Sequence, residues 1–207
     1  TLGPEQAGVL TSIAYLMKFQ TRRARANRFY NAFLCQPFQA PAGGLSDLDD
    51  PDPPLDLTQR EGCRYCHAIL EPAASHWGRF GEYGAGYLDP ATHAPYSDDC
   101  AWCAETGESC SPVCANYYVV DPLSSEEDPW VGWMKSYEFL DERHGENIEI
   151  GPRLLVADGL VDGRLPQCVA RNTASWLLGR EIADVEEGWL TELAGRFSAS
   201  GFDYKAL

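Results

Sequence analysis

The spacing of apolar side chains predicts a chain built mainly from α-helices. Apolar residues recur at intervals of three and four in five segments: residues 6–19, 24–34, 151–160, 166–178 and 184–197. Gly179 and Gly201 follow the last two segments, and glycine is the residue that most often ends a helix. The pattern therefore predicts a mainly α fold with helices at both ends of the chain.

Two further helices are expected nearer the middle. Ser125, Asp128 and Pro129 resemble a helix N-terminus. The apolar residues after them share one helical face: Trp130, Trp133, Met134, Tyr137 and Leu140. A short helix should also follow His67 and be interrupted near Pro72, because proline lacks the amide hydrogen that a helix interior uses.

The segments between these helices have the composition of loops. Residues 36–57 are rich in proline, glycine and aspartate, and they predict an extended surface loop that leads to Cys63. Residues 78–86 contain four glycines, and residues 89–122 combine turn residues with cysteines and show no sustained periodicity. We expect one domain over residues 1–207, with residues 89–149 as a cysteine-rich insertion.

Length and charge indicate a single acidic domain and argue against two classes of protein, those that bind nucleic acid and those that span a membrane. A chain of 207 residues suits one domain, and 31 acidic against 16 basic side chains give a formal net charge of −15. Nucleic acid is excluded as a partner, because phosphate binding needs clustered Lys and Arg. No apolar run is long enough for a transmembrane segment. Thr1 begins no signal peptide and Asp203 could cap a helix that Leu207 cuts short, so we expect a mature or trimmed segment, compatible with a longer protein.

Cys63, Cys66 and His67 form a Cys-x-x-Cys-His motif that occurs once in the chain. Two thiols at this spacing can add to the vinyl groups of haem, while the adjacent imidazole ligates the iron. A disulfide, a thiol-exchange pair or half of a zinc site would explain the cysteines but not the histidine after them. The motif predicts one covalent haem c with His67 as the proximal ligand.

The second axial ligand has three main candidates. Met134 lies on the apolar face of the helix predicted up to Leu140, where core packing is the simpler interpretation. His144 follows that helix, where it could equally be a solvated residue near the helix end. His76 lies shortly after the motif, and His93 lies among turns and is the weakest candidate.

The six other cysteines make an even number, which allows three disulfides: Cys35, Cys100, Cys103, Cys110, Cys114 and Cys168. The four central ones do not have the spacing of two zinc knuckles, so two local disulfides are favoured over a zinc or iron–sulfur site. Cys35 and Cys168 would then pair. Eight cysteines in a chain of this size indicate an oxidising compartment, so we expect an exported protein of the periplasm, cell surface or extracellular space.

Charged residues suggest a partner. One basic run stands out: Lys18, Arg22, Arg23, Arg25 and Arg28. Arginines of this run could bind the haem propionates, although a solvated helix face that balances the aspartates of residues 47–56 is the simpler interpretation. Acidic side chains predominate between residues 121 and 149, which favours a redox partner protein with a basic docking face.

Several blocks together resemble the planctomycete-type haem c domains of large exported proteins. They are residues 8–11, 21–22 and 34–37, the motif from Cys63 to His67 with residues 70–72, and, later, residues 165–171 and 177–180. The resemblance implies export, covalent haem and a helical c-type cytochrome-like fold. Residues 70–72 read Leu-Glu-Pro where members of the family often have Met-Asp-Pro, so no distal ligand follows from the resemblance.

Three functions are consistent with this sequence. The leading one is electron transfer by a single six-coordinate haem. The second is a peroxidase-like haem enzyme with an open distal site, for which the sequence shows no convincing acid–base pair. The third is a surface or assembly module in which haem is structural. The sequence leaves the oligomeric state open.

Overall fold

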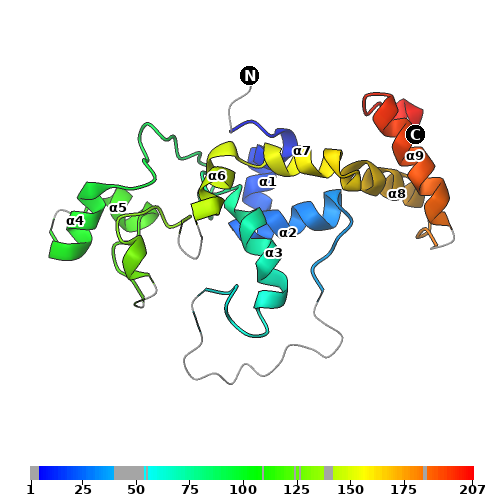
Figure 1. Ribbon diagram of the computed structural model, residues 1–207. Helices are drawn as coiled ribbons and strands as arrows, with labels where there is room; N and C mark the ends of the chain where they lie inside the picture. Colours follow the sequence, from blue (N-terminus) through cyan, green and yellow to red (C-terminus); the bar gives the residue numbers. More distant parts are fainter. Residues whose placement is uncertain are drawn as a thin grey trace. The chain divides into compact units, whose positions relative to one another are not determined.

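The described part of the chain is helical, which confirms the mainly α prediction. The computed structural model describes residues 5–39, 54, 56–108, 110–123, 125, 127–137, 142–183 and 186–207, so most of the predicted loop at residues 36–57 lies outside it. Within these residues the chain forms α-helices, short 3-10 helices and three isolated β-bridges, without a strand (Figure 1). None of the helices described is both long and apolar enough to cross a membrane.

The chain divides into two compact units. Unit 1 comprises Thr1–Ala26 and Gln39–Pro152, and unit 2 comprises Asn27–Phe38 and Arg153–Leu207. The helix α2 (Arg22–Phe33) contributes its first residues to unit 1 and the rest to unit 2. The Cys-x-x-Cys-His motif belongs to unit 1.

Two helical segments replace the first predicted helix. They are η1 (Gly8–Thr11) and α1 (Ile13–Lys18), so the prediction of one helix over residues 6–19 is wrong. Ser12 between them is extended, and its Oγ accepts a hydrogen bond from the Tyr15 amide at 3.3 Å. A serine in this position caps a new helix. The helix predicted over residues 24–34 is confirmed by α2.

The motif lies at the start of α3 (Arg64–Ser75), which continues through Pro72. The predicted interruption at Pro72 is therefore wrong. The second half of α3 is buried, the helix α6 (Glu142–Ile150) packs against α3, and the Asn147 amide donates to the Pro72 carbonyl at 3.3 Å. Burial of this half offsets the hydrogen bond that proline removes.

Two disulfides cross-link the cysteine-rich segment. Cys100 pairs with Cys114 and Cys103 with Cys110, at Cα–Cα distances of 5.2 and 5.0 Å. The two local disulfides that the sequence predicts are confirmed. They tie together two short helices, which the sequence analysis did not anticipate: α4 (Asp98–Thr106) and α5 (Pro112–Tyr117).

The helix predicted from Ser125 to Leu140 does not form over the described residues 127–137, where η2 (Asp128–Trp130) is the one helical turn. Gly132 has a φ of +82°, which favours glycine, and its N–H and C=O pair with Val119 and Ser97, each at 2.9 Å. The segment therefore runs extended between two neighbouring parts of unit 1. Its apolar side chains join a buried cluster around the two disulfides rather than one face of a helix.

One arginine of the basic run is fully buried. Arg25 is 0% exposed, and its guanidinium donates to the carbonyls of Phe19, Gly81 and Gly84 at 2.8, 2.9 and 3.1 Å. Desolvation lowers the pKa of Arg25 to about 10. The interpretation of the run as a solvated helix face is therefore wrong for Arg25, because several carbonyls of unit 1 converge on it.

Unit 2 contains three helices that the sequence predicts. They are α7 (Arg153–Val161), α8 (Arg164–Leu178) and α9 (Glu187–Ala199). Gly179 ends α8 with a φ of +66°, as expected for a C-terminal glycine. A short 3-10 helix, η4 (Tyr204–Ala206), follows the cap that Asp203 provides.

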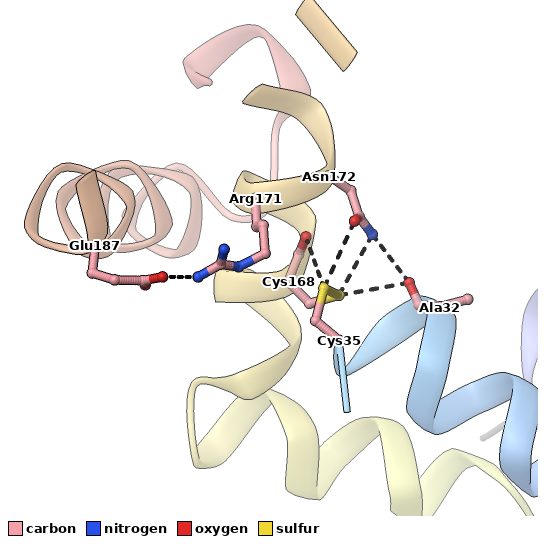
Figure 2. The surroundings of a disulfide bond; sticks show 6 residues. All are labelled: Ala32, Cys35, Cys168, Arg171, Asn172 and Glu187. Atoms are coloured by element: carbon pink, nitrogen blue, oxygen red, sulfur yellow. Dashed lines mark hydrogen bonds and ion pairs between the residues drawn. A yellow bond between two sulfur atoms is a disulfide. The ribbon is translucent and has the colours of Figure 1, made fainter. Parts of the chain in front are cut away.

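A disulfide joins the end of α2 to α8 within unit 2 (Figure 2). Cys35 and Cys168 have a Cα–Cα distance of 5.3 Å, which confirms the predicted pair. The Asn172 amide donates to the Ala32 carbonyl beside it at 3.2 Å. On the other side of α8, Arg171 forms an ion pair with Glu187 of α9.

Candidate functional site

The motif residues lie on one face of the first half of α3. The His67 amide donates to the Cys63 carbonyl at 3.1 Å, as expected for residues four apart in a helix. Helical spacing places Cys63, Cys66 and His67 together, because residues three and four apart are neighbours on a helix surface. A turn before the helix fixes its start, where the Cys63 and Arg64 amides both donate to the Arg60 carbonyl.

This half of α3 lies outside the protein core. Residues 64–69 are exposed or half-buried, whereas residues 70–75 are buried apart from Pro72. Ile69 is 51% exposed and lies three residues after Cys66, so one large apolar side chain lies uncovered next to that thiol. Tyr65 is 60% exposed but lies toward the other side of the helix. An exposed apolar surface next to reactive groups is typical of a binding site.

Cys63 and Cys66 are the two cysteines that form no disulfide. Both are half-buried thiols, while the other six cysteines of the chain are paired. The motif therefore has two thiols available for covalent attachment.

Glu71 holds the imidazole of His67. Its Oε1 is hydrogen-bonded to His67 Nδ1, and the same oxygen accepts from Arg23 Nε at 2.7 Å. A neutral imidazole that donates from Nδ1 has its Nε2 lone pair free for a metal. The sequence analysis missed Glu71, although its position four residues after His67 on a helix is a local signal.

These residues fit a covalently bound haem. The thiols are free and correctly spaced, one imidazole nitrogen is held by a carboxylate, and the apolar side chain of Ile69 next to Cys66 is exposed. Among the residues that the structure describes, no group of three or more His, Cys, Asp or Glu side chains is arranged to hold a metal ion on its own.

The three candidates for the second axial position have different surroundings. Met134 is 1% exposed, and its Sδ accepts a hydrogen bond from Arg79 Nη1 at 3.3 Å. His76 is 4% exposed, and its Nδ1 lies 3.1 Å from the Gly151 carbonyl oxygen. His144 lies on α6, which packs against α3, and its buried Nδ1 has no hydrogen-bond partner in the described part of the chain.

Neither the contacts of His93 nor the lining of a cavity in unit 1 includes a residue of the motif. His93 Nδ1 is 2.9 Å from Thr92 Oγ1, and the ring packs edge-on against Tyr117. A cavity of about 260 Å³ is lined by Arg22 together with residues from 78–88, 116–117 and 134–136. Its lining includes Met134 but none of the three motif residues.

No protein-family model, curated protein or solved structure matches this chain. The resemblance to planctomycete-type haem c domains therefore stays a prediction, and the function is argued from the residues around α3.

Proposed function

We propose that this chain is a c-type haem domain of an exported protein, which transfers electrons through one haem c attached to Cys63 and Cys66 and ligated by His67. One observation carries the proposal. The chain pairs six of its eight cysteines and keeps the other two as thiols beside His67, on the exposed half of α3. When bound, haem c supplies an iron centre that takes up and releases one electron.

Each residue around the motif has a distinct role in this proposal. Cys63 and Cys66 hold the group by thioether bonds, and His67 presents Nε2 to the iron because Nδ1 is occupied. Ile69, three residues after Cys66, supplies apolar surface that contact with a porphyrin would remove from water.

His144 is the second axial ligand that the contacts favour. Its helix packs against α3, and its Nδ1 is buried without a partner among the described residues, which is costly unless a further group is present. Met134 and His76 each already have a partner inside the core of unit 1. His144→Ala should therefore change the low-spin spectrum of the loaded protein, whereas Met134→Ala should not.

The disulfides indicate the cellular compartment that we propose, and the net charge indicates the kind of partner. Three disulfides are typical of the periplasm, cell surface or extracellular space. With a net charge of −15, the chain favours a redox partner that docks through a basic face.

Covalent attachment can be tested directly. The protein is exported in a bacterium that also expresses a c-type haem maturation system and a known c-type cytochrome. We expect a Soret band, an intact mass equal to polypeptide plus one haem, and colour that stays with the polypeptide after acid–acetone extraction. Cyanide and carbon monoxide should leave the spectrum unchanged if the iron is six-coordinate.

A pair of double variants controls this experiment. C63A/C66A should lose the haem, whereas C103A/C110A removes two cysteines from the same unit and should keep it. If the parent protein has the bare polypeptide mass while the known cytochrome is loaded in the same cells, the proposal is wrong. Ready binding of carbon monoxide would favour an open distal site instead.

A further inference from the structure

Glu71 is a buried carboxylate with two nitrogen partners. Its side chain is 6% exposed, whereas those of His67 and Arg23 are 20% and 39% exposed. Both partners contact the same oxygen, Oε1. The carboxylate is thus fixed from two sides and largely shielded from water.

A salt bridge that only ties α2 to α3 would need Arg23 and Glu71 alone. The hydrogen bond to His67 adds a chemical effect, because the acceptor at one ring nitrogen decides which nitrogen is left for a metal. A carboxylate acceptor also makes the imidazole a stronger electron donor than a neutral acceptor does. Its negative charge acts at short range, and the low local dielectric strengthens it.

We propose that Glu71 is a positioning residue that fixes the orientation and tautomer of His67 and lowers the reduction potential of the bound haem. Arg23 limits this effect, because it draws charge from the oxygen that faces His67. The inference rests on the proposed function. It assigns to the domain a potential lower than the same haem would have with a neutral group at position 71.

Glu71→Gln tests the inference with little change in size. The parent and the variant are loaded with haem in cells, and their potentials are measured by spectroelectrochemical titration. We expect the ferric–ferrous equilibrium to shift toward the ferrous form by tenfold or more in E71Q, which is about 59 mV for one electron. The g values in the electron paramagnetic resonance spectrum of the low-spin ferric form should change as well, because they depend on the orientation and donor strength of the axial imidazole.

Glu82→Gln is the matched control. Glu82 also pairs with an arginine of α2, Arg22, at 3.4 Å, so E82Q removes the same charge from the same unit without touching His67. Arg23→Gln should shift the reduction potential in the opposite direction. Loss of the arginine leaves more negative charge on the Glu71 oxygen that faces the imidazole, so the potential should fall. Arg23 is partly exposed, so R23Q remains informative if E71Q does not fold.

The outcomes separate this inference from the proposed function. If neither the parent nor any variant carries haem, the proposed function fails and takes this inference with it. If all carry haem, but E71Q shifts no more than E82Q or R23Q fails to lower the potential, the role of Glu71 is refuted while the haem domain stands. Opposite shifts in E71Q and R23Q, with E82Q close to the parent, support it.

Discussion

Loss of the disulfide between Cys35 and Cys168 should destabilise the protein more than loss of either disulfide in unit 1. A disulfide restricts the unfolded chain, and its contribution grows with the logarithm of the length of the loop that it closes. The three disulfides span 133, 14 and 7 residues. At 25 °C the chain-entropy relation gives contributions of about 5, about 3 and about 2.4 kcal/mol respectively.

Native contacts around this disulfide support the same order. Cys168 is 2% exposed, and its removal leaves a small void beside α2, so packing adds to the entropic effect. The Asn172 side chain also contacts both sulfurs, at 3.5 Å from Cys168 Sγ and 3.7 Å from Cys35 Sγ (Figure 2). Its hydrogen bond to the Ala32 carbonyl needs neither sulfur and still holds α2 against α8. We therefore expect the variant C35A/C168A to fold with reduced stability rather than to lose its secondary structure.

Urea denaturation followed by far-ultraviolet circular dichroism measures these differences. The parent is compared with C35A/C168A, C100A/C114A and C103A/C110A under non-oxidising conditions that leave the remaining disulfides intact. The loss in free energy of unfolding should be largest for C35A/C168A, smaller for C100A/C114A and smallest for C103A/C110A. The largest and smallest losses should differ by roughly 2.6 kcal/mol. Equal losses, or a larger loss for C103A/C110A, would show that loop length does not govern the contribution of these disulfides.

Two further predictions concern the backbone and pH. Gly132→Ala should destabilise unit 1 by at least about 2 kcal/mol, because a left-handed backbone disfavours alanine and its Cβ would lie 2.7 Å from that of Ala101. Gly188→Ala, in open space on α9, should instead gain about 0.4–1 kcal/mol, and thermal unfolding of both variants distinguishes strain from a general effect of alanine. The hydrogen bond from Arg180 holds the pKa of Glu186 at about 2, below its ordinary value of 4.5. Because the folded state has the lower pKa, this stabilisation is present above about pH 4.5 and is lost as the pH falls toward 2. The thermal midpoint of E186Q should therefore fall less than that of the parent over this range, and parallel curves would contradict the assignment.

The helices α2, α7, α8 and α9 could be predicted because their signals are local. The helix α8 combines apolar spacing with a terminal glycine, and both lie within its own sequence. The segment at residues 127–137 shows the opposite case. Its apolar residues are spaced as in a helix, but they pack around disulfides elsewhere in the chain, and its backbone pairs with Val119 and Ser97. Gly132, in the middle of the predicted helix, was the one local sign against it.

In the candidate site, too, local features could be predicted from the sequence, whereas contacts between distant residues could not. The motif is contiguous in sequence, and Glu71 could have been found from its spacing to His67. The contact of Arg23 with Glu71 joins residues 48 positions apart, and no periodicity predicts it. The same holds for Arg79, which lies 55 positions from Met134 and donates to its sulfur. Such pairs depend on how the helices of unit 1 pack.

Burial changes along α3, so its buried half packs in the core while its exposed half carries the motif of the candidate site. Ile69 is half exposed and Leu70 is buried, so the boundary of the core crosses the helix between His67 and Glu71. The His67 side chain is therefore partly exposed, at 20%, while the Glu71 carboxylate that holds it is 6% exposed and lies in a medium of low dielectric. A carboxylate on the exposed half would be screened by water and could neither orient the ring nor influence an iron centre to the same extent. The position of Glu71, one helical turn inside the core, is therefore the basis of the effect on His67 that we propose.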